Sequence, residues 1–241
     1  MSLEDSIGVV VFILAFAAVV YLSIRSARKK QAQDGGTVRT RALQESAGDA
    51  APLAGIPPVT VALIVASVAV ALLSNLGSSV STLFPLFIAE PGSAGFQSIL
   101  SGQVWRLLTP IFIHFGVMHV LFNMMWLWDL GGFIERRKGW PFFVGFVLAV
   151  GIASNVAQYV IEGSPFFGGM SGVVYGLLGY VWINGWRNPQ SGFGLHKQTA
   201  VMMFGWYVLC WTGLLGLIAN WAHTAGLLIG IAIGFRKQPD Q

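Results

Sequence analysis

Charged residues are scarce in this chain. Asp, Glu, Lys and Arg make up 10% of its 241 residues, whereas a soluble domain carries about 25%. Hydrophobic residues make up 55%. This balance excludes an ordinary soluble domain and predicts an integral membrane protein that lies in the lipid bilayer. The formal net charge of +4 does not indicate nucleic-acid binding, because the basic residues follow a membrane topology.

Cysteine and clustered metal ligands are also scarce. The single cysteine, Cys210, lies in an apolar run, so the sequence excludes an intrachain disulfide and a cysteine-based metal site. We interpret it as a small buried hydrophobic residue. His114 and His119 are five residues apart and do not align on one helix face, and Asp129 is expected near the cytoplasmic end of its helix. We therefore expect no metal site.

Long apolar stretches, by contrast, are abundant. The first, 7–24, follows two acidic residues and precedes a basic cluster, which is the opposite of a secretory signal peptide. We expect a retained helix there, with its N-terminus outside the cytoplasm. Six further helices are expected at 59–73, 110–130, 141–161, 170–186, 199–217 and 221–235. The predicted fold is an all-α polytopic membrane protein, a six-helix core with one additional N-terminal transmembrane helix.

Composition divides the chain into four parts. These are an N-terminal transmembrane helix (1–24), a flexible cytoplasmic linker rich in Ala, Gly, Gln and Pro (25–57), the six-helix core (58–236) and a cytoplasmic tail (237–241).

The distribution of Lys and Arg supports this topology. The stretches expected in the cytoplasm, 25–58, 131–140, 187–198 and 236 onward, contain thirteen of the fourteen Lys and Arg residues. Only Arg106 falls outside them, in a long, partly apolar, non-cytoplasmic loop from about 75 to 109.

Glycine recurs at a spacing of about four residues in two of the expected helices. Such faces of small residues let helix backbones approach closely, so we expect these two helices to pack together. The glycines are Gly172, Gly176 and Gly179 in one helix and Gly226, Gly230 and Gly234 in the other.

A few polar residues interrupt the apolar helices at a comparable depth on the non-cytoplasmic side. Ser171 follows a Gly-Gly-Met bend at the start of a helix, where unpaired N–H groups favour negative charge. His119 and Asn123 are four apart and share a helix face. His223 lies near the outer end of the last helix. Singly, each residue type is more often structural, but their joint placement indicates a site.

The chemistry that fits these residues is acyl transfer. Ser171 would be the nucleophile and His223 the general base and then the general acid. No acidic residue stands near His223 in the sequence, so we expect a dyad, with Tyr175, one turn below Ser171, stacked on the imidazole. His119, Asn123 and the Ser171 N–H group could form an oxyanion hole.

The motifs resemble those of the rhomboid family of intramembrane serine proteases, closest to its bacterial members, over roughly residues 58 to 236. The matching pieces are Trp105-Arg106, His114 to Asn123, Gly131 to Glu135, Gly168 to Tyr175 and Ala222 to Gly230, in the family's order. The resemblance implies the roles given above for Ser171, His223, His119 and Asn123. It also implies a water-filled cavity open to the non-cytoplasmic side, with no metal and no cofactor.

The resemblance implies further roles and partners. Gly169 and His114 would support the site, His114 through hydrogen bonds beneath the first loop. Trp105, Arg106, Glu135 and Arg137 would be structural. Substrates would be single-pass transmembrane proteins with helix-destabilising residues near the cut. They would pass the helix at 199–217, with the loop at 213–220 as a cap. The acidic N-terminus argues against a mitochondrial transit peptide, so we expect a bacterial plasma (inner) membrane.

Two alternatives stay open at this point. A catalytically inactive rhomboid-like binding protein would usually lack Ser171 or His223, and this chain keeps both. A transporter would use intramembrane carboxylates or broken helices in repeats. Asp129 alone does not make a proton relay, and such a protein would need Ser171 and His223 as packing residues.

Overall fold

The computed structural model describes residues 56–93, 95–187, 189, 192–214 and 218–236. The predicted N-terminal helix (1–24), nearly all of the predicted linker (25–57) and the predicted tail (237–241) lie outside these residues. The described part contains helices and connecting loops and no strand, which confirms the all-α prediction for this part of the chain.

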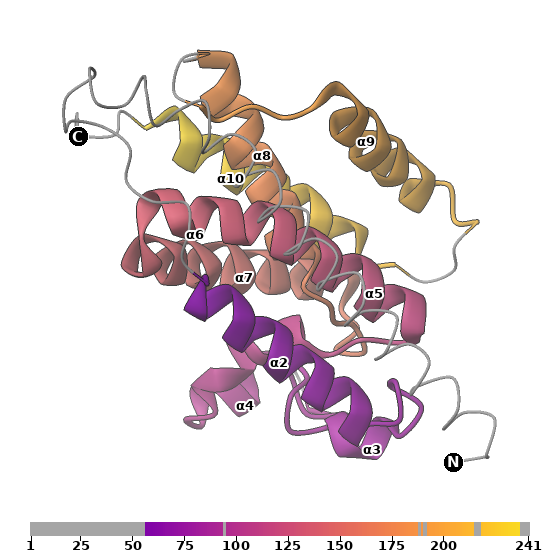
Figure 1. Cartoon of the computed structure of the whole chain (residues 1–241). Helices are drawn as coiled ribbons and strands as arrows, with labels where there is room; N and C mark the ends of the chain where they lie inside the picture. Colours follow the sequence, from indigo (N-terminus) through magenta and orange to yellow (C-terminus); the bar gives the residue numbers. More distant parts are fainter. Residues whose placement is uncertain (1–55, 94, 188, 190–191, 215–217, 237–241) are drawn as a thin grey trace, which may run out of the picture. The chain divides into compact units, whose positions relative to one another are not determined.

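The elements follow one another along the chain as shown in Figure 1. They are α2 (Pro58–Leu73), α3 (Val80–Leu83), α4 (Gln97–Leu100), the short turns η1 (Val104–Leu107) and η2 (Thr109–Phe112), α5 (Val117–Trp126), the π-helical turn η3 (Leu127–Gly131), α6 (Gly132–Lys138), α7 (Trp140–Glu162), α8 (Ser171–Arg187), α9 (Lys197–Trp211) and α10 (Asn220–Phe235).

The prediction of a helix at 110–130 is wrong at both ends. Pro110 lies in a single 3₁₀ turn, η2, and Gly116, at φ +88°, adopts a backbone conformation that lies outside the right-handed helix. The helix starts at Val117 and continues through η3 and α6 to Lys138. The stretch predicted as a cytoplasmic loop is thus helical, because Ile134 and Glu135 are buried on its inner face.

The predicted helix at 199–217 is also too long, since α9 ends at Trp211. The bounds of α2, α7, α8 and α10 lie within one or two residues of those predicted.

Two helical stretches are long and apolar enough to cross a membrane by length and composition: Val117–Lys138, with 22 residues, and Trp140–Glu162, with 23. The apolar helices α2 and α10 have 16 residues each. At about 1.5 Å per residue they are roughly 24 Å long, shorter than a hydrocarbon core of about 30 Å. Length alone therefore does not identify six spanning helices in the described part.

Helices α8 and α10 pack along each other, as the glycine pattern predicts (Figure 1, orange and yellow). A Cβ atom added at Gly226 would collide with the carbonyl oxygen of Gly172, and one at Gly230 with that of Gly176. The two backbones are therefore in direct contact, with no side chain between them at these points. This contact brings the first turn of α8 beside the first turn of α10.

The loop between α2 and α5 is fixed from inside by Arg106. Its buried guanidinium donates from Nη1 to the carbonyl oxygens of Phe84 (2.7 Å) and Phe87 (2.9 Å), and from Nε to Gln103 (2.6 Å). Its Nη2 forms an ion pair with Glu90 at 3.2 Å. Arg106, the one basic residue outside the expected cytoplasmic stretches, thus organises this loop.

Candidate active site

Ser171 and His223 meet where α8 and α10 begin. The distance between Ser171 Oγ and His223 Nε2 is 2.8 Å, a hydrogen bond between a hydroxyl and an imidazole nitrogen. Two features set this distance. The glycine contact fixes the separation of the helices, and the side chain of Gln158 on α7 fixes the start of α10, because its Oε1 accepts from the N–H groups of Trp221 and Ala222 at 3.1 Å each. The sequence marks Gln158 as polar in an apolar helix but does not indicate this role.

The imidazole of His223 is almost completely buried, with 4% of its surface exposed. The ring of Tyr175 lies against it, with ring centroids 4.7 Å apart and planes inclined by 37°. Within the described part of the chain, Nδ1 has no hydrogen-bond partner. No carboxylate therefore orients this imidazole there, and packing against Tyr175 takes that place.

Gly169 lets His119 approach the serine. Its φ of +127° is a conformation that L-residues with side chains rarely adopt. A Cβ atom at this position would lie 2.7 Å from His119 Nε2 and 3.5 Å from Ser171 Oγ. The space above Gly169 is therefore bordered by both groups, and any larger residue would fill it.

His119 and Asn123 are joined along one face of α5. His119 Nδ1 accepts a hydrogen bond from the N–H group of Phe115 at 3.2 Å. That bond requires the tautomer with the proton on Nε2, so Nε2 is a donor on the side of Gly169. Asn123 Nδ2 donates to the His119 carbonyl oxygen at 2.8 Å and keeps a second N–H. Both side chains can thus offer hydrogen bonds.

His114 lies beneath this group and connects the loop before α5 to the chain before Ser171. Its fully buried ring accepts from the N–H group of Met170 at Nε2, at 3.4 Å, and its Nδ1 lies 3.0 Å from the carbonyl oxygen of Phe112. The two contacts agree on one neutral tautomer, with the proton on Nδ1. Gly169 N–H donates to the Pro110 carbonyl oxygen at 3.0 Å in the same place.

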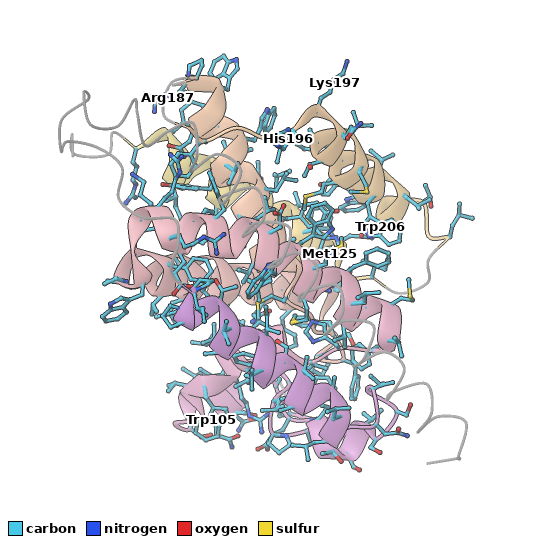
Figure 2. All side chains as sticks on the ribbon, viewed as in Figure 1. Trp105, Met125, Arg187, His196, Lys197 and Trp206 are labelled. Atoms are coloured by element: carbon cyan, nitrogen blue, oxygen red, sulfur yellow. The ribbon has the colours of Figure 1, made fainter. Side chains whose placement is uncertain are left out.

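The other predicted residues lie away from the dyad. Figure 2 shows Trp105 near α4, at the opposite end of the described core from Arg187 and His196. The indole N–H of Trp105 donates to the Pro85 carbonyl oxygen at 3.2 Å. Arg106 anchors the same loop. These two residues act on the loop and make no contact with the dyad that would give them a chemical role.

Glu135 and Arg137 lie on α6. The buried carboxylate of Glu135 accepts from the N–H groups of Val59 (2.8 Å) and Thr60 (2.7 Å), and from the Thr60 hydroxyl (2.7 Å). It therefore satisfies the N-terminal donors of α2. The Arg137 guanidinium lies 5.1 Å from the centre of the Phe133 ring, within cation–π distance.

The described residues contain no group of three or more His, Cys, Asp or Glu side chains arranged to hold a metal ion. At Ser171 a hydroxyl lies within hydrogen-bond distance of an imidazole nitrogen, with hydrogen-bond donors nearby, an arrangement that acyl transfer by a serine can use.

Comparison with known proteins agrees with this geometry. Residues 101–238 match the model of the rhomboid domain. The chain is 39% identical over 179 residues to the rhomboid protease GlpG of Salmonella choleraesuis (strain SC-B67), a match that covers 74% of this chain and 62% of the relative. It is 43% identical over 141 residues to the rhomboid protease GlpG of Salmonella paratyphi A (strain ATCC 9150 / SARB42), covering 58% and 51%.

The chain belongs to the rhomboid family, whose domain implies a polytopic membrane fold. It spans between about half and two thirds of the length of these relatives.

Proposed function

We propose that this protein is an intramembrane serine endopeptidase that cleaves peptide bonds in or near transmembrane segments through an acyl-enzyme. The 2.8 Å contact between Ser171 Oγ and His223 Nε2 carries this proposal. Two relatives that bear the name rhomboid protease, at about 40% identity, support it. An inactive binding protein would have no need for this pairing.

In the first half-reaction His223 Nε2 takes the proton of Ser171 as Oγ attacks the carbonyl carbon. The negative charge on the carbonyl oxygen is stabilised by the Ser171 N–H group, by His119 Nε2–H and by the second N–H of Asn123. One such donor contributes about 10²–10³ in rate. His223 then gives its proton to the leaving amine, and water releases the acyl group by the reverse sequence. The face of Tyr175 stabilises the transient imidazolium.

Substrates in this proposal are single-pass transmembrane proteins that reach the dyad between α5 and α9. The ring contact between Phe122 and Trp206, with centroids 5.6 Å apart, is a weak closure there. Figure 2 shows Trp206 and Met125 on the sides of α9 and α5 that face each other. Helix α9 buries only Met203 and Cys210, so it is the helix most easily displaced. The loop at 213–220, only part of which is described, would cap the site.

We also propose a bacterial inner-membrane location, with the site open to the non-cytoplasmic side and a six-helix core (58–236) between an N-terminal helix (1–24), a linker (25–57) and a tail (237–241). The charge distribution supports this orientation. Arg187 lies in the last turn of α8, at the other end of that helix from Ser171. Arg137 and Lys138 at the end of α6 and Lys197 at the start of α9 fall in the stretches expected in the cytoplasm.

The test is labelling of the detergent-solubilised full chain with a fluorophosphonate. Ser171 Oγ would form a bond to phosphorus, fluoride would leave, and the hydroxyl proton would pass to His223. We expect labelling of the wild type and its loss in Ser171→Ala and His223→Ala, with Ser164→Ala as a control because that serine is exposed.

Two results would contradict the proposal. Labelling that persists in Ser171→Ala would assign the nucleophile to another serine. Failure of a folded wild type to label, beside an active rhomboid protease that labels well, would favour a binding protein.

A further inference from the structure

Helix α9 is held to the rest of the core by side chains that reach across from its neighbours. Three of its residues, Met203, Tyr207 and Cys210, follow the i, i+4, i+7 spacing of a single helix face. Each makes a hydrogen bond to a residue of α8 or to the first turns of α10. The backbone of α9, unlike that of α8, does not run in close contact with α10.

A chain of three hydrogen bonds runs from Tyr207 on α9 to Thr224 and Asn220 on α10 and back to Cys210 on α9. Thr224 donates its single hydroxyl proton to the Asn220 carbonyl oxygen at 3.0 Å. Tyr207 must then be the donor in its 2.7 Å contact with Thr224 Oγ1. Asn220 Nδ2 donates the last hydrogen bond of the chain to the Cys210 carbonyl oxygen, at 3.2 Å. Thr224, the α10 residue that Tyr207 contacts, directly follows His223 in the chain.

A second set of contacts runs from Tyr207 to the imidazole through Tyr175. The rings of Tyr207 and Tyr175 meet edge to face with centroids 5.6 Å apart, and the Tyr175 ring in turn lies 4.7 Å from that of His223. Tyr175 also donates its hydroxyl to the Met203 carbonyl oxygen on α9, at 3.3 Å. The ring that orients His223 is therefore itself held by α9.

We propose that Tyr207 is a positioning residue that makes the orientation of His223 depend on the position of α9. With α9 closed, Tyr207 holds both Thr224 and Tyr175, and the imidazole faces Ser171. With α9 displaced, both contacts are lost, and the base loses its support until the helix returns. A substrate that keeps α9 displaced would be bound but acylated slowly. This inference rests on the proposed protease function.

The experiment measures fluorophosphonate labelling of the full chain over a range of probe concentrations. It gives the maximal rate constant and the half-saturating concentration separately. We expect Tyr207→Leu to lower the maximal rate by between about tenfold and a hundredfold, because small displacements of a catalytic group have effects of this size. The half-saturating concentration should not change, since the contacts of Tyr207 are with Thr224 and Tyr175 and not with Ser171.

Conservative variants separate positioning from folding. Tyr207→Phe keeps the ring and should restore most of the rate lost in Tyr207→Leu, with a remaining loss of roughly threefold from the missing hydrogen bond. Thr224→Val should give a similar loss, and the double variant no more than either, because both remove one interaction. Val208→Ala is the matched control, since that side chain is 64% exposed on α9.

Several results would overturn the inference. One is a wild-type maximal labelling rate in Tyr207→Leu, and another is an equal fall of that rate in Val208→Ala. A third is a double variant in which the rate losses of Tyr207→Phe and Thr224→Val multiply. If Tyr207→Leu does not fold, the pair of conservative variants decides. If the wild type and Tyr207→Leu label equally well, only this inference is refuted. Wild-type protein that does not label refutes the proposed function as well.

Discussion

The loop from residue 75 to residue 116 and helix α9 are fixed in the molecule by different kinds of contact. The loop is irregular in backbone, yet Phe87, Ile88 and Ile113 are fully buried and the Arg106 guanidinium holds its carbonyl groups from inside. Helix α9 is regular, yet it buries two side chains and is held by a few ring contacts and hydrogen bonds. Regular secondary structure is thus a poor guide to rigidity here. The loop has the buried contacts of a scaffold, and α9 has the few contacts that its proposed displacement requires.

The largest effect that this comparison predicts is on the stability of the loop. Arg106→Met would leave the buried carbonyl groups of Phe84 and Phe87 without their donor, at a cost of roughly 3 kcal/mol or more in the free energy of unfolding. Thermal unfolding in detergent measures it. Lys197→Met removes an exposed cation from α9 and should change that free energy by less than about 0.5 kcal/mol. Equal destabilisation by the two variants would remove the distinction between loop and helix.

A second fixed point, at the start of α2, should show a somewhat smaller effect. The Glu135 carboxylate accepts three hydrogen bonds from Val59 and Thr60. In Glu135→Gln one of the two oxygens becomes an NH₂ group, which is itself a donor and cannot accept these bonds. We expect a loss of about 2 kcal/mol in the free energy of unfolding. Glu162→Gln, at the exposed end of α7, is the control. Wild-type stability in Glu135→Gln would show that water replaces the carboxylate as acceptor.

The movable helix should respond in activity more than in stability. Trp206→Ala removes the ring contact with Phe122, and such contacts contribute about 0.5–1.5 kcal/mol. If this contact keeps α9 closed, its loss should raise a small open fraction, and with it the cleavage of a transmembrane substrate, roughly threefold. Fluorophosphonate labelling should stay near the wild-type rate, because α9 is still closed most of the time and Tyr207 still supports His223. Trp186→Ala, which removes an exposed tryptophan of α8, is the control. A parallel fall of cleavage and labelling in Trp206→Ala would mean that Trp206 supports the site itself.

The smallest effect is expected on the outer face of α9. Val201 is 65% exposed, so Val201→Ala should change the free energy of unfolding by no more than about 0.5 kcal/mol and leave labelling unchanged. Both are measured on the same detergent-purified protein. A loss beyond 1 kcal/mol would reveal a contact on this face and weaken the description of α9 as loosely held.

The sequence was informative about this protein wherever a pattern has one physical cause. Glycine at a spacing of four predicts close helix contact, and α8 and α10 do meet in this way. Because that contact and the topology place Ser171 and His223 at the same depth, their proximity could be anticipated. The start of α5 could not, because the apolar residues around Pro110 have the composition of a helix. Only the fold reveals that this stretch has another conformation, with His114 Nδ1 beside the Phe112 carbonyl oxygen and the Gly169 N–H group donating to the Pro110 carbonyl oxygen.

The contacts of Tyr207 could not have been read from the sequence either. Tyrosine and threonine in apolar helices are common, and nothing in their spacing relates residue 207 to residue 224. The signal that could have drawn attention to them is positional. Thr224 follows the expected base directly, and Tyr207 occupies the same face of its helix as Met203 and Cys210.

The direct contact between α8 and α10 also bears on how this protein can change over generations. Most interhelical distances can be retuned by exchanging one side chain for a slightly larger or smaller one. At Gly226 and Gly230 there is no side chain to exchange, and every substitution adds atoms where the backbone of α8 already lies. At Gly172 and Gly176 an added side chain would meet Ser154 and Val150 of α7. The separation of Ser171 and His223 is therefore closed to gradual adjustment by mutation. Under the proposed function, variation in rate and substrate choice would instead arise at the residues around α9, where single replacements can act in small steps.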